Sequence, residues 1–200
     1  MNGLDIWEAR WAPYDEPTYR AALSYVRPDD VVLDIGAGDL RLARRMAGLA
    51  RRVYAIDMQP GLLAGRAPLP PNLTVFCADA RRVPWPGGIT LGILLMRHCT
   101  HLGQYVARLR AAGCRRLVTN ARWGFDIEQV DLGRRAAWSS VDLGWYACIC
   151  GQTGFGPGPV ELISEDRIEQ VSEVETCPAC STYRWPATEY KNTHPAPHNT

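Results

Sequence analysis

Short apolar runs alternate with amphipathic stretches along the first 123 residues of the chain. Each run is almost uniformly apolar, which is typical of a strand that is buried on both faces of a sheet. The five predicted strands are residues 31–36, 52–57, 73–79, 89–96 and 115–121. Apolar residues at helical spacing predict helices at residues 16–26, 40–50, 60–66 and 101–113. The pattern therefore predicts an α/β fold, with an open, mostly parallel sheet and helices on both faces.

The rhythm changes after Trp123. Residues 136–151 and 168–185 are strand-like, aromatic and cysteine-bearing, and the Gly/Pro-rich residues 152–166 join them. This pattern is typical of an antiparallel β-hairpin rather than of another β-helix-β unit. We expect the two cysteine-bearing segments to form its arms.

The composition is that of an ordinary globular protein, with 46% hydrophobic and 22% charged residues. The net charge of +1 gives no overall field that would attract nucleic acid or a membrane. The first residues lack a signal-peptide pattern, and the most apolar run, residues 89–96, is too short to span a bilayer. We therefore expect a cytoplasmic protein with no membrane partner and with reduced cysteines.

The segment VVLDIGAGDLRLARRM, residues 31–46, leads from a strand through two glycines into a helix. Such a turn brings backbone N–H groups close to a nucleotide-like ligand. Three predicted strands carry an acid at their carboxyl ends, namely Asp34, Asp57 and Asp79. Because the carboxyl ends of parallel strands meet at one edge, these acids outline a pocket for an adenosine-containing molecule.

The details of this turn distinguish between ligands. A dinucleotide site favours a third glycine, but this chain has Arg41 at that place, and Asp39 would put a carboxylate beside the phosphates. The chain contains no Gly-Lys-Ser/Thr sequence, which excludes a P-loop. A sulfonium cation that also carries an amino group tolerates the nearby acids.

Here the chain resembles the class I S-adenosylmethionine (SAM)-dependent methyltransferases, over roughly residues 29–121. The resemblance lies in VLDIGAGDLRLARRM, VYAIDMQPGLL and VFCADA. It implies a Rossmann-like fold in which Gly36 and Gly38 line the methionine part of SAM. It also implies that Asp57 binds the ribose and that Asp79 contacts the adenine. The remaining expected cofactor residues are Asp34, Ala37, Met58, Ala80 and Met96. The family often has a third glycine where this chain has Leu40, which bears on the shape of the loop.

Four of the seven cysteines form two close pairs, Cys148 with Cys150 and Cys177 with Cys180. Two thiolates at each of two chain bends can surround Zn²⁺ tetrahedrally. Four thiolates leave no open coordination position, so the predicted zinc is structural. The alternatives are inert or reducible cysteines and an iron–sulfur cluster.

These patterns divide the chain into four predicted parts. Residues 1–28 form an N-terminal helical cap, and residues 29–123 form the SAM-binding Rossmann-like domain. Residues 124–185 form a zinc-ribbon-like hairpin lobe, interpreted as the antiparallel pair that completes the methyltransferase sheet. Residues 186–200 are polar and proline-containing, and we expect them to be disordered.

Class I enzymes place substrate-handling residues after the fourth strand, where this chain reads LLMRHCTHLGQY. The segment is not the Asn/Asp-Pro-Pro-Tyr/Phe with which amino-methylating enzymes hold a flipped base. His98 is a candidate general base, with His101 as a weaker one, and Arg97 is a candidate for holding an anionic group. The alternative for each histidine is a purely structural role.

The N-terminal aromatic residues Trp7, Trp11 and Tyr14 either cover the cofactor pocket or pack on the helices. The leading hypothesis is a SAM-dependent methyltransferase with an unidentified acceptor, for which the zinc lobe favours RNA or protein over a small molecule. The alternatives are a non-catalytic SAM-binding or zinc-ribbon interaction protein and a nucleic-acid-binding module, which the arginine pairs suggest. No pattern predicts an oligomeric state.

Overall fold

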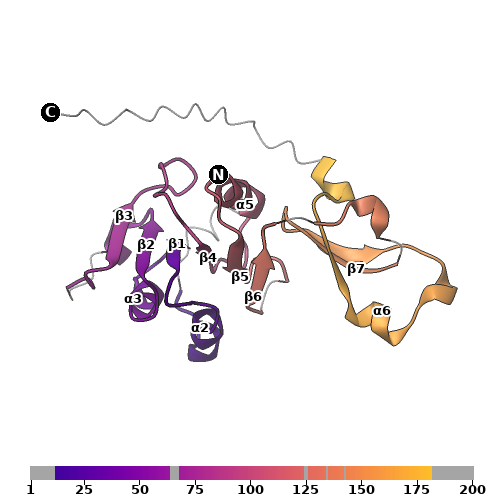
Figure 1. Cartoon of the computed structure of the whole chain (residues 1–200), viewed down its shortest axis with the longest axis horizontal. Coiled ribbons are helices and arrows are strands. Elements are labelled where there is room, and N and C mark those ends of the chain that lie inside the picture. Colours follow the sequence, from indigo (N-terminus) through magenta and orange to yellow (C-terminus); the bar gives the residue numbers. More distant parts are fainter. Residues whose placement is uncertain (1–11, 64–67, 124–125, 134, 142, 182–200) are drawn as a thin grey trace.

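The main sheet has six strands, five of them parallel. A computed structural model describes residues 12–63, 68–123, 126–133, 135–141 and 143–181, and it orders this sheet β3-β2-β1-β4-β5-β6 (Figure 1). The strands are β1 (Val31–Ile35), β2 (Arg52–Asp57), β3 (Leu73–Cys77), β4 (Leu91–Leu94), β5 (Arg116–Thr119) and β6 (Glu128–Asp131). β6 pairs antiparallel with β5, and all other pairs are parallel. The predicted fold class is confirmed.

Helices cover both faces of this sheet. They are α2 (Glu16–Leu23), α3 (Arg41–Ala47), α4 (Pro60–Leu63) and α5 (Leu102–Ala111). Figure 1 shows α2 and α3 on one side of the sheet and α5 on the other. Consecutive residues of β1 point to opposite faces, so Val32 joins the core under α2 and α3 while Leu33 joins the core under α5. This double burial explains why the strands read as continuous apolar runs.

The observed bounds of these elements lie close to the predicted ones. β2 has the predicted bounds, and the ends of the other four predicted strands move by one or two residues. α2 begins where Asp15 accepts a hydrogen bond from the Thr18 N–H at 2.9 Å, and it ends at Leu23 rather than at Val26. The predicted helix over 60–66 is seen over Pro60–Leu63, and its remaining residues lie outside the described ones.

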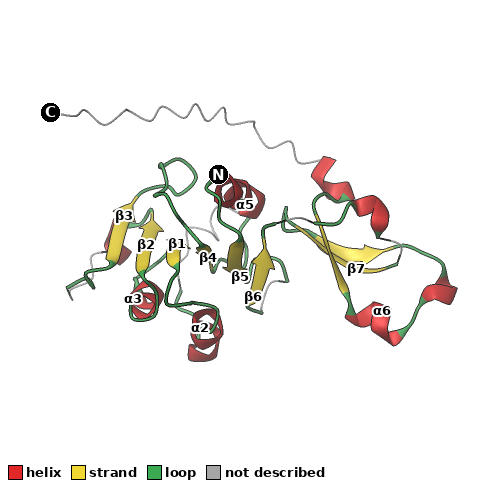
Figure 2. Ribbon diagram, viewed as in Figure 1, coloured by secondary structure: helices red, strands yellow, loops and turns green. Residues whose placement is uncertain are grey.

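The C-terminal region forms a separate small sheet with the order β8-β7-β9 (Figure 2). Its strands are β7 (Gly144–Cys148), β8 (Thr153–Gly156) and β9 (Val171–Val174), and α6 (Glu165–Glu169) precedes β9. Three 3₁₀ turns complete the region, η1 (Trp138–Ser140), η2 (Val160–Leu162) and η3 (Pro178–Ser181).

The topology of this region differs from the expected hairpin. The two cysteine-bearing strands, β7 and β9, pair in parallel, and β8 from the Gly/Pro-rich connection is the antiparallel partner of β7. The chain reverses directly after β7, where Gly151 has a φ of +101° that glycine adopts without strain. The connection then returns through α6, so that β9 runs beside β7 in the same direction. β6 is the single strand that the described part of this region adds to the main sheet, instead of a pair.

None of the helices in the described residues has the length and apolar character that a membrane span requires. Residues 1–11, with Trp7 and Trp11, and residues 182–200, with the predicted disordered tail, lie outside the described part.

Candidate cofactor and metal sites

Three acids stand at adjacent strand ends of the main sheet. Asp34 is in β1, Asp57 ends β2, and Asp79 follows β3 by two residues. Because the sheet order is β3-β2-β1, the three strands are direct neighbours and their carboxyl ends share one edge.

Asp57 fastens the glycine loop to β2. One carboxylate oxygen accepts a hydrogen bond from the Gly38 N–H at 2.8 Å, and the other accepts one from the Gln59 N–H at 2.8 Å. The loop is also held by the Ile56 carbonyl, which accepts hydrogen bonds from the N–H groups of Gly36 and Ala37. Gly36 and Gly38 have φ values of +74° and +56°, which favour glycine. The loop therefore has a fixed shape at the edge of the sheet.

Met96 packs directly against Gly36. A Cβ atom at position 36 would lie 3.1 Å from the Met96 sulfur and 3.2 Å from its methyl carbon. The glycine is thus required both by its backbone angle and by this close approach. The structure brings together two expected cofactor residues that are 60 positions apart in the sequence.

Asp34 is buried beside this loop, and its Oδ2 atom has no hydrogen-bond partner among the described residues. Burial, and secondly the negative charge of Asp57, raise the pKa of Asp34 to about 7. A cationic hydrogen-bond donor at this point would satisfy the oxygen and favour its ionised form.

Leu40 adopts the left-handed conformation with a φ of +66°, directly before α3. Its side chain is only 1% exposed and belongs to the core under α2 and α3. A third glycine would adopt this backbone angle without strain, whereas leucine adopts it at a cost that burial of the side chain offsets.

Arg81 engages Asp79, the acid expected to contact adenine. The guanidinium lies 2.9 Å from one carboxylate oxygen and 3.0 Å from the other. Although partial burial raises the pKa of Asp79, its hydrogen bonds with Arg81 have the larger combined effect and lower it. Ala80 is buried, and its carbonyl accepts a hydrogen bond from the Trp85 indole at 3.0 Å.

The two histidines after β4 differ in their surroundings. His101 is near Arg81, with the Nε2 atom 3.1 Å from a guanidinium nitrogen, and its Nδ1 atom is 3.2 Å from the Thr100 hydroxyl. Because a guanidinium can only donate, the Nε2 atom is the acceptor in this contact. His98 is exposed to solvent.

Arg97 and Tyr14 form a second contact after β4. The Arg97 guanidinium lies over the Tyr14 ring, 4.9 Å from its centroid. The Tyr14 hydroxyl donates a hydrogen bond to the Leu95 carbonyl at 3.2 Å. It accepts one from the backbone N–H of Arg97 at 3.4 Å. Tyr14 thus lies over the end of β4. This position fits both roles considered for it, covering the cofactor pocket and packing on the helices.

Met58 directly follows Asp57 and is exposed over 61% of its surface. It lines an open depression of about 470 Å³ together with Gln59, Pro60, Gly61 and Leu62. This depression begins directly after Asp57.

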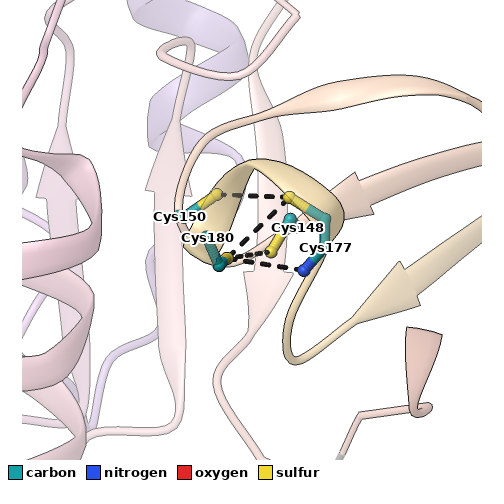
Figure 3. A group of neighbouring side chains, drawn as sticks. All are labelled: Cys148, Cys150, Cys177 and Cys180. Carbon is teal, nitrogen blue, oxygen red and sulfur yellow. Dashed lines mark hydrogen bonds between the residues drawn. The ribbon is translucent and has the colours of Figure 1, made fainter. Parts of the chain in front are cut away.

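The four clustered cysteines converge at one point of the small lobe (Figure 3). Cys148 and Cys180 are 3.5 Å apart between sulfurs, and Cys150 and Cys177 are 3.8 Å apart. All four sulfurs lie within 4.8 Å of one another. Tetrahedral zinc with bonds of about 2.3 Å requires sulfurs about 3.8 Å apart, so the donor set fits this ion. The parallel pairing of β7 and β9 explains the convergence, because it brings the carboxyl ends of both strands to one edge.

Sequence reasoning missed two residues of the carboxyl edge. The ion pair of Arg81 with Asp79 was not predicted from the sequence. Nor was Asn120 singled out as a buried polar residue at this edge. Asn120 follows β5 and is completely buried, and neither polar atom of its side chain has a hydrogen-bond partner in the described part. A polar residue directly after a buried apolar strand was the available signal.

Comparison with known proteins gives one curated relative of note. The chain is 34% identical over 68 residues to the probable ribosomal RNA small subunit methyltransferase A of Methanosarcina mazei. The match covers 32% of this chain and 25% of the relative, so the chain spans about a quarter of that protein's length. No protein-family model matches the chain.

Several solved structures are similar to about half of the chain. They include a precorrin 8W decarboxylase from Methanobacterium thermoautotrophicum, with 21% identity, a TM-score of 0.47, and 56% of this chain and 65% of that one covered. A dimethyladenosine transferase from Plasmodium falciparum has 16% identity and a TM-score of 0.43, with 52% and 41% covered. A putative methyltransferase from Streptococcus mutans in complex with SAH has 15% identity and a TM-score of 0.38, with 52% and 69% covered.

Proposed function

We propose that this chain is a SAM-dependent methyltransferase. The observation that supports it best is the glycine loop that Asp57 holds against β2, with the unpartnered carboxylate oxygen of Asp34 buried beside it. SAM would be held by its methionine part at Asp34 and the loop, by its ribose at Asp57, and by its adenine at Asp79 and Ala80. When bound, SAM supplies an electrophilic methyl group on a sulfonium.

The charge of the site favours this cofactor over a dinucleotide. Asp57 and the ionised form of Asp34 stand at neighbouring strand ends and would repel a pyrophosphate, whereas the ammonium and sulfonium groups of SAM are cationic. The ammonium group is the kind of donor that the Asp34 oxygen lacks.

Methyl transfer is an in-line displacement, so the protein's main tasks are alignment and the exclusion of water. His98 is the candidate base, because it follows β4 and is exposed where an acceptor could approach it. Arg97 is the candidate for holding an anionic group of the acceptor, and its stacking on Tyr14 fixes its position.

RNA or protein is the proposed class of acceptor. The curated relative's name supports RNA, since that protein is described as a ribosomal RNA methyltransferase. The segment after β4 lacks Asn/Asp-Pro-Pro-Tyr/Phe, which argues against the amino group of a flipped base as the target.

We also propose that the four cysteines bind a structural zinc ion. Their sulfur separations match a tetrahedral thiolate site. The small sheet around them consists of strands of four or five residues, which need such a staple.

A non-catalytic SAM-binding protein is the second candidate, and the engagement of Asp79 by Arg81 favours it. Calorimetry with S-adenosylhomocysteine tests both candidates. We expect binding to the wild-type chain and about 5- to 100-fold weaker binding to Asp57→Ala, since a hydrogen bond to a charged group is lost. Asp29→Ala, at an exposed position before β1, is the matched control.

Absence of binding to the wild-type chain would refute both candidates. If the wild-type chain binds the ligand, a turnover assay separates the enzyme from the non-catalytic protein. The assay measures release of S-adenosylhomocysteine from SAM in the presence of RNA and of protein acceptors.

A further inference from the structure

The small sheet exposes a row of apolar side chains on one face. Trp145 stands opposite Phe155 on β8 and Val171 on β9, so the three side chains share a face. The exposed fraction is 38% for Trp145, 43% for Phe155 and 43% for Val171. Trp123, which follows β5, packs edge-on against Trp145 with ring centroids 6.2 Å apart. We call these four residues the aromatic row.

The opposite face of the same sheet is closed. There Tyr146 packs against Trp138 with centroids 4.6 Å apart, and Cys148 and Val174 are completely buried. The exposure of the aromatic row is therefore a property of one face and not of a loosely packed lobe.

Exposed apolar residues concentrate in this lobe. Of the eleven large hydrophobic residues that are exposed in the described part, seven lie between Trp145 and Val171. Four of these belong to the connection between β8 and β9: Val160, Leu162, Ile163 and Ile168. A concentration of this kind marks an interaction surface rather than scattered exposure.

The same connection is acidic. The wider lobe that contains this connection, residues 141–181, has seven acidic residues and one arginine. Glu173 and Glu175 pair with arginines of the main domain, whereas four exposed acids alternate with the exposed apolar residues: Glu161, Glu165, Asp166 and Glu169. α6 contacts β7 and leads through Gln170 into Val171, so the acidic segment is joined to the aromatic row at the first residue of β9.

We infer that the aromatic row and the acidic segment 160–169 form a docking surface for a basic protein segment in which arginines alternate with apolar residues. One arginine of the partner can stack on the face of Trp145, and others can pair with the carboxylates of the acidic segment. The apolar residues of the partner would cover Phe155, Val171 and Ile168. This inference is independent of the proposed methyltransferase activity.

The charge argues against nucleic acid on this surface. Exposed aromatic rings can stack on bases, but that mode of binding accompanies a positively charged groove. Here the acids would repel the phosphates. A nucleic-acid acceptor would therefore approach the main domain rather than this face.

Fluorescence anisotropy with labelled probes tests the inference on the full chain supplied with zinc. The probes are two peptides of equal length and leucine content, one with arginine and one with glutamate at its charged positions, and a single-stranded oligouridylate. We expect only the arginine peptide to bind, with an affinity that falls as salt increases.

The surface itself is tested by substitution. The double variant Glu165→Arg with Asp166→Arg should weaken binding of the arginine peptide about tenfold or more, and Trp145→Ser about fivefold. Asp29→Arg removes an exposed acid outside the lobe and should leave affinity within about twofold. Zinc content and circular dichroism show whether each variant is folded. If Trp145→Ser loses zinc, Phe155→Ser is used in its place.

Four outcomes would overturn the inference. The first is the absence of arginine-peptide binding, and the second is equal binding of both peptides or binding that survives in the lobe variants. The third is binding of the oligouridylate that Trp145→Ser abolishes, which would assign the row to nucleic acid. The fourth is self-association in sedimentation velocity that Trp145→Ser abolishes, which would assign it to a second copy of the chain.

Discussion

Arg122 and Glu173 form a two-point ion pair between the main domain and the small sheet. The guanidinium nitrogens lie 2.7 Å and 2.6 Å from the two carboxylate oxygens of Glu173, which is in β9. Arg122 follows β5, and it also donates hydrogen bonds to Glu128 of β6 at 2.8 Å and 2.6 Å. Its side chain is 1% exposed. One buried guanidinium therefore connects an edge strand of each sheet.

Glu173→Gln should weaken this connection at neutral pH. Burial raises the pKa of Glu173, but its hydrogen bond with Arg122 and the charges of Arg122 and Arg135 lower it below the ordinary 4.5. Because the folded-state pKa is depressed, the stabilisation is complete above about pH 4.5 and disappears as the pH falls below it. We expect a loss of about 1–2 kcal/mol in the free energy of unfolding at pH 7, since Glu173 is partly exposed and Arg122 keeps Glu128.

Urea unfolding at several pH values measures this difference. The gap between wild type and Glu173→Gln should close as the pH falls below about 4. Glu16→Gln breaks an exposed ion pair with Arg45 and should change stability less. A constant gap at all pH values would contradict the role of the Glu173 charge.

Asp34→Asn should remove a pH-dependent loss of stability from the unliganded protein. The pKa of Asp34 is raised to about 7, firstly by burial and secondly by Asp57, so the folded state holds a proton that the unfolded state releases near pH 4. Stability from this group therefore falls as the pH rises from about 4 to about 7, by up to about 4 kcal/mol. Thermal unfolding without ligand, followed from pH 5 to pH 8, should show wild type losing stability relative to Asp34→Asn. Parallel curves would contradict it.

The main sheet could be predicted because its strands are short, apolar and doubly buried. In β2 the apolar run ends where the acid begins, so even the bounds follow from the sequence. The small lobe could not be predicted in the same way. β7 and β8 contain glycine, and each of the three strands has an exposed residue. The parallel pairing of Trp145 with Val171 depends on a return of the chain through α6 that no local pattern specifies.

The same distinction applies to the candidate sites. The positions of Asp34, Asp57 and Asp79 follow from strand order, because each acid comes at the end of an apolar run. The side-chain partners do not follow, since only the folded chain shows that Arg81 bonds both oxygens of Asp79 while Arg82 lies 3.6 Å from one of them. The meeting of Gly36 with Met96 likewise depends on β1 and β4 being neighbours.

Leu40→Gly should be less destabilising than Leu40→Ala, because Leu40 precedes α3 in the left-handed conformation that glycine adopts most easily. Both substitutions remove a side chain that is 1% exposed, at a cost of about 2–5 kcal/mol. Only alanine keeps the strain of a φ of +66°, which costs about 1 kcal/mol. Urea unfolding should therefore rank the variants as leucine, then glycine, then alanine. Ala43→Gly, inside α3, is the control and should cost about 1 kcal/mol in the ordinary direction. A Leu40→Ala variant more stable than Leu40→Gly would contradict the strain.

Cys177→Ser should release the metal and loosen the small lobe while the main sheet stays folded. Removing one of four thiolates lowers zinc affinity strongly, and the folding of a lobe this small depends on the bound ion. Metal analysis of the wild-type chain should give one zinc per chain. Amide hydrogen exchange of the variant should be faster in β7 and β9, whereas the protection of β1 and β4 should not change. Cys77→Ser, at an exposed cysteine outside the cluster, is the matched control and should keep the zinc. Wild-type protein without zinc, or a variant whose β7 stays equally protected, would show that packing alone holds the four sulfurs together.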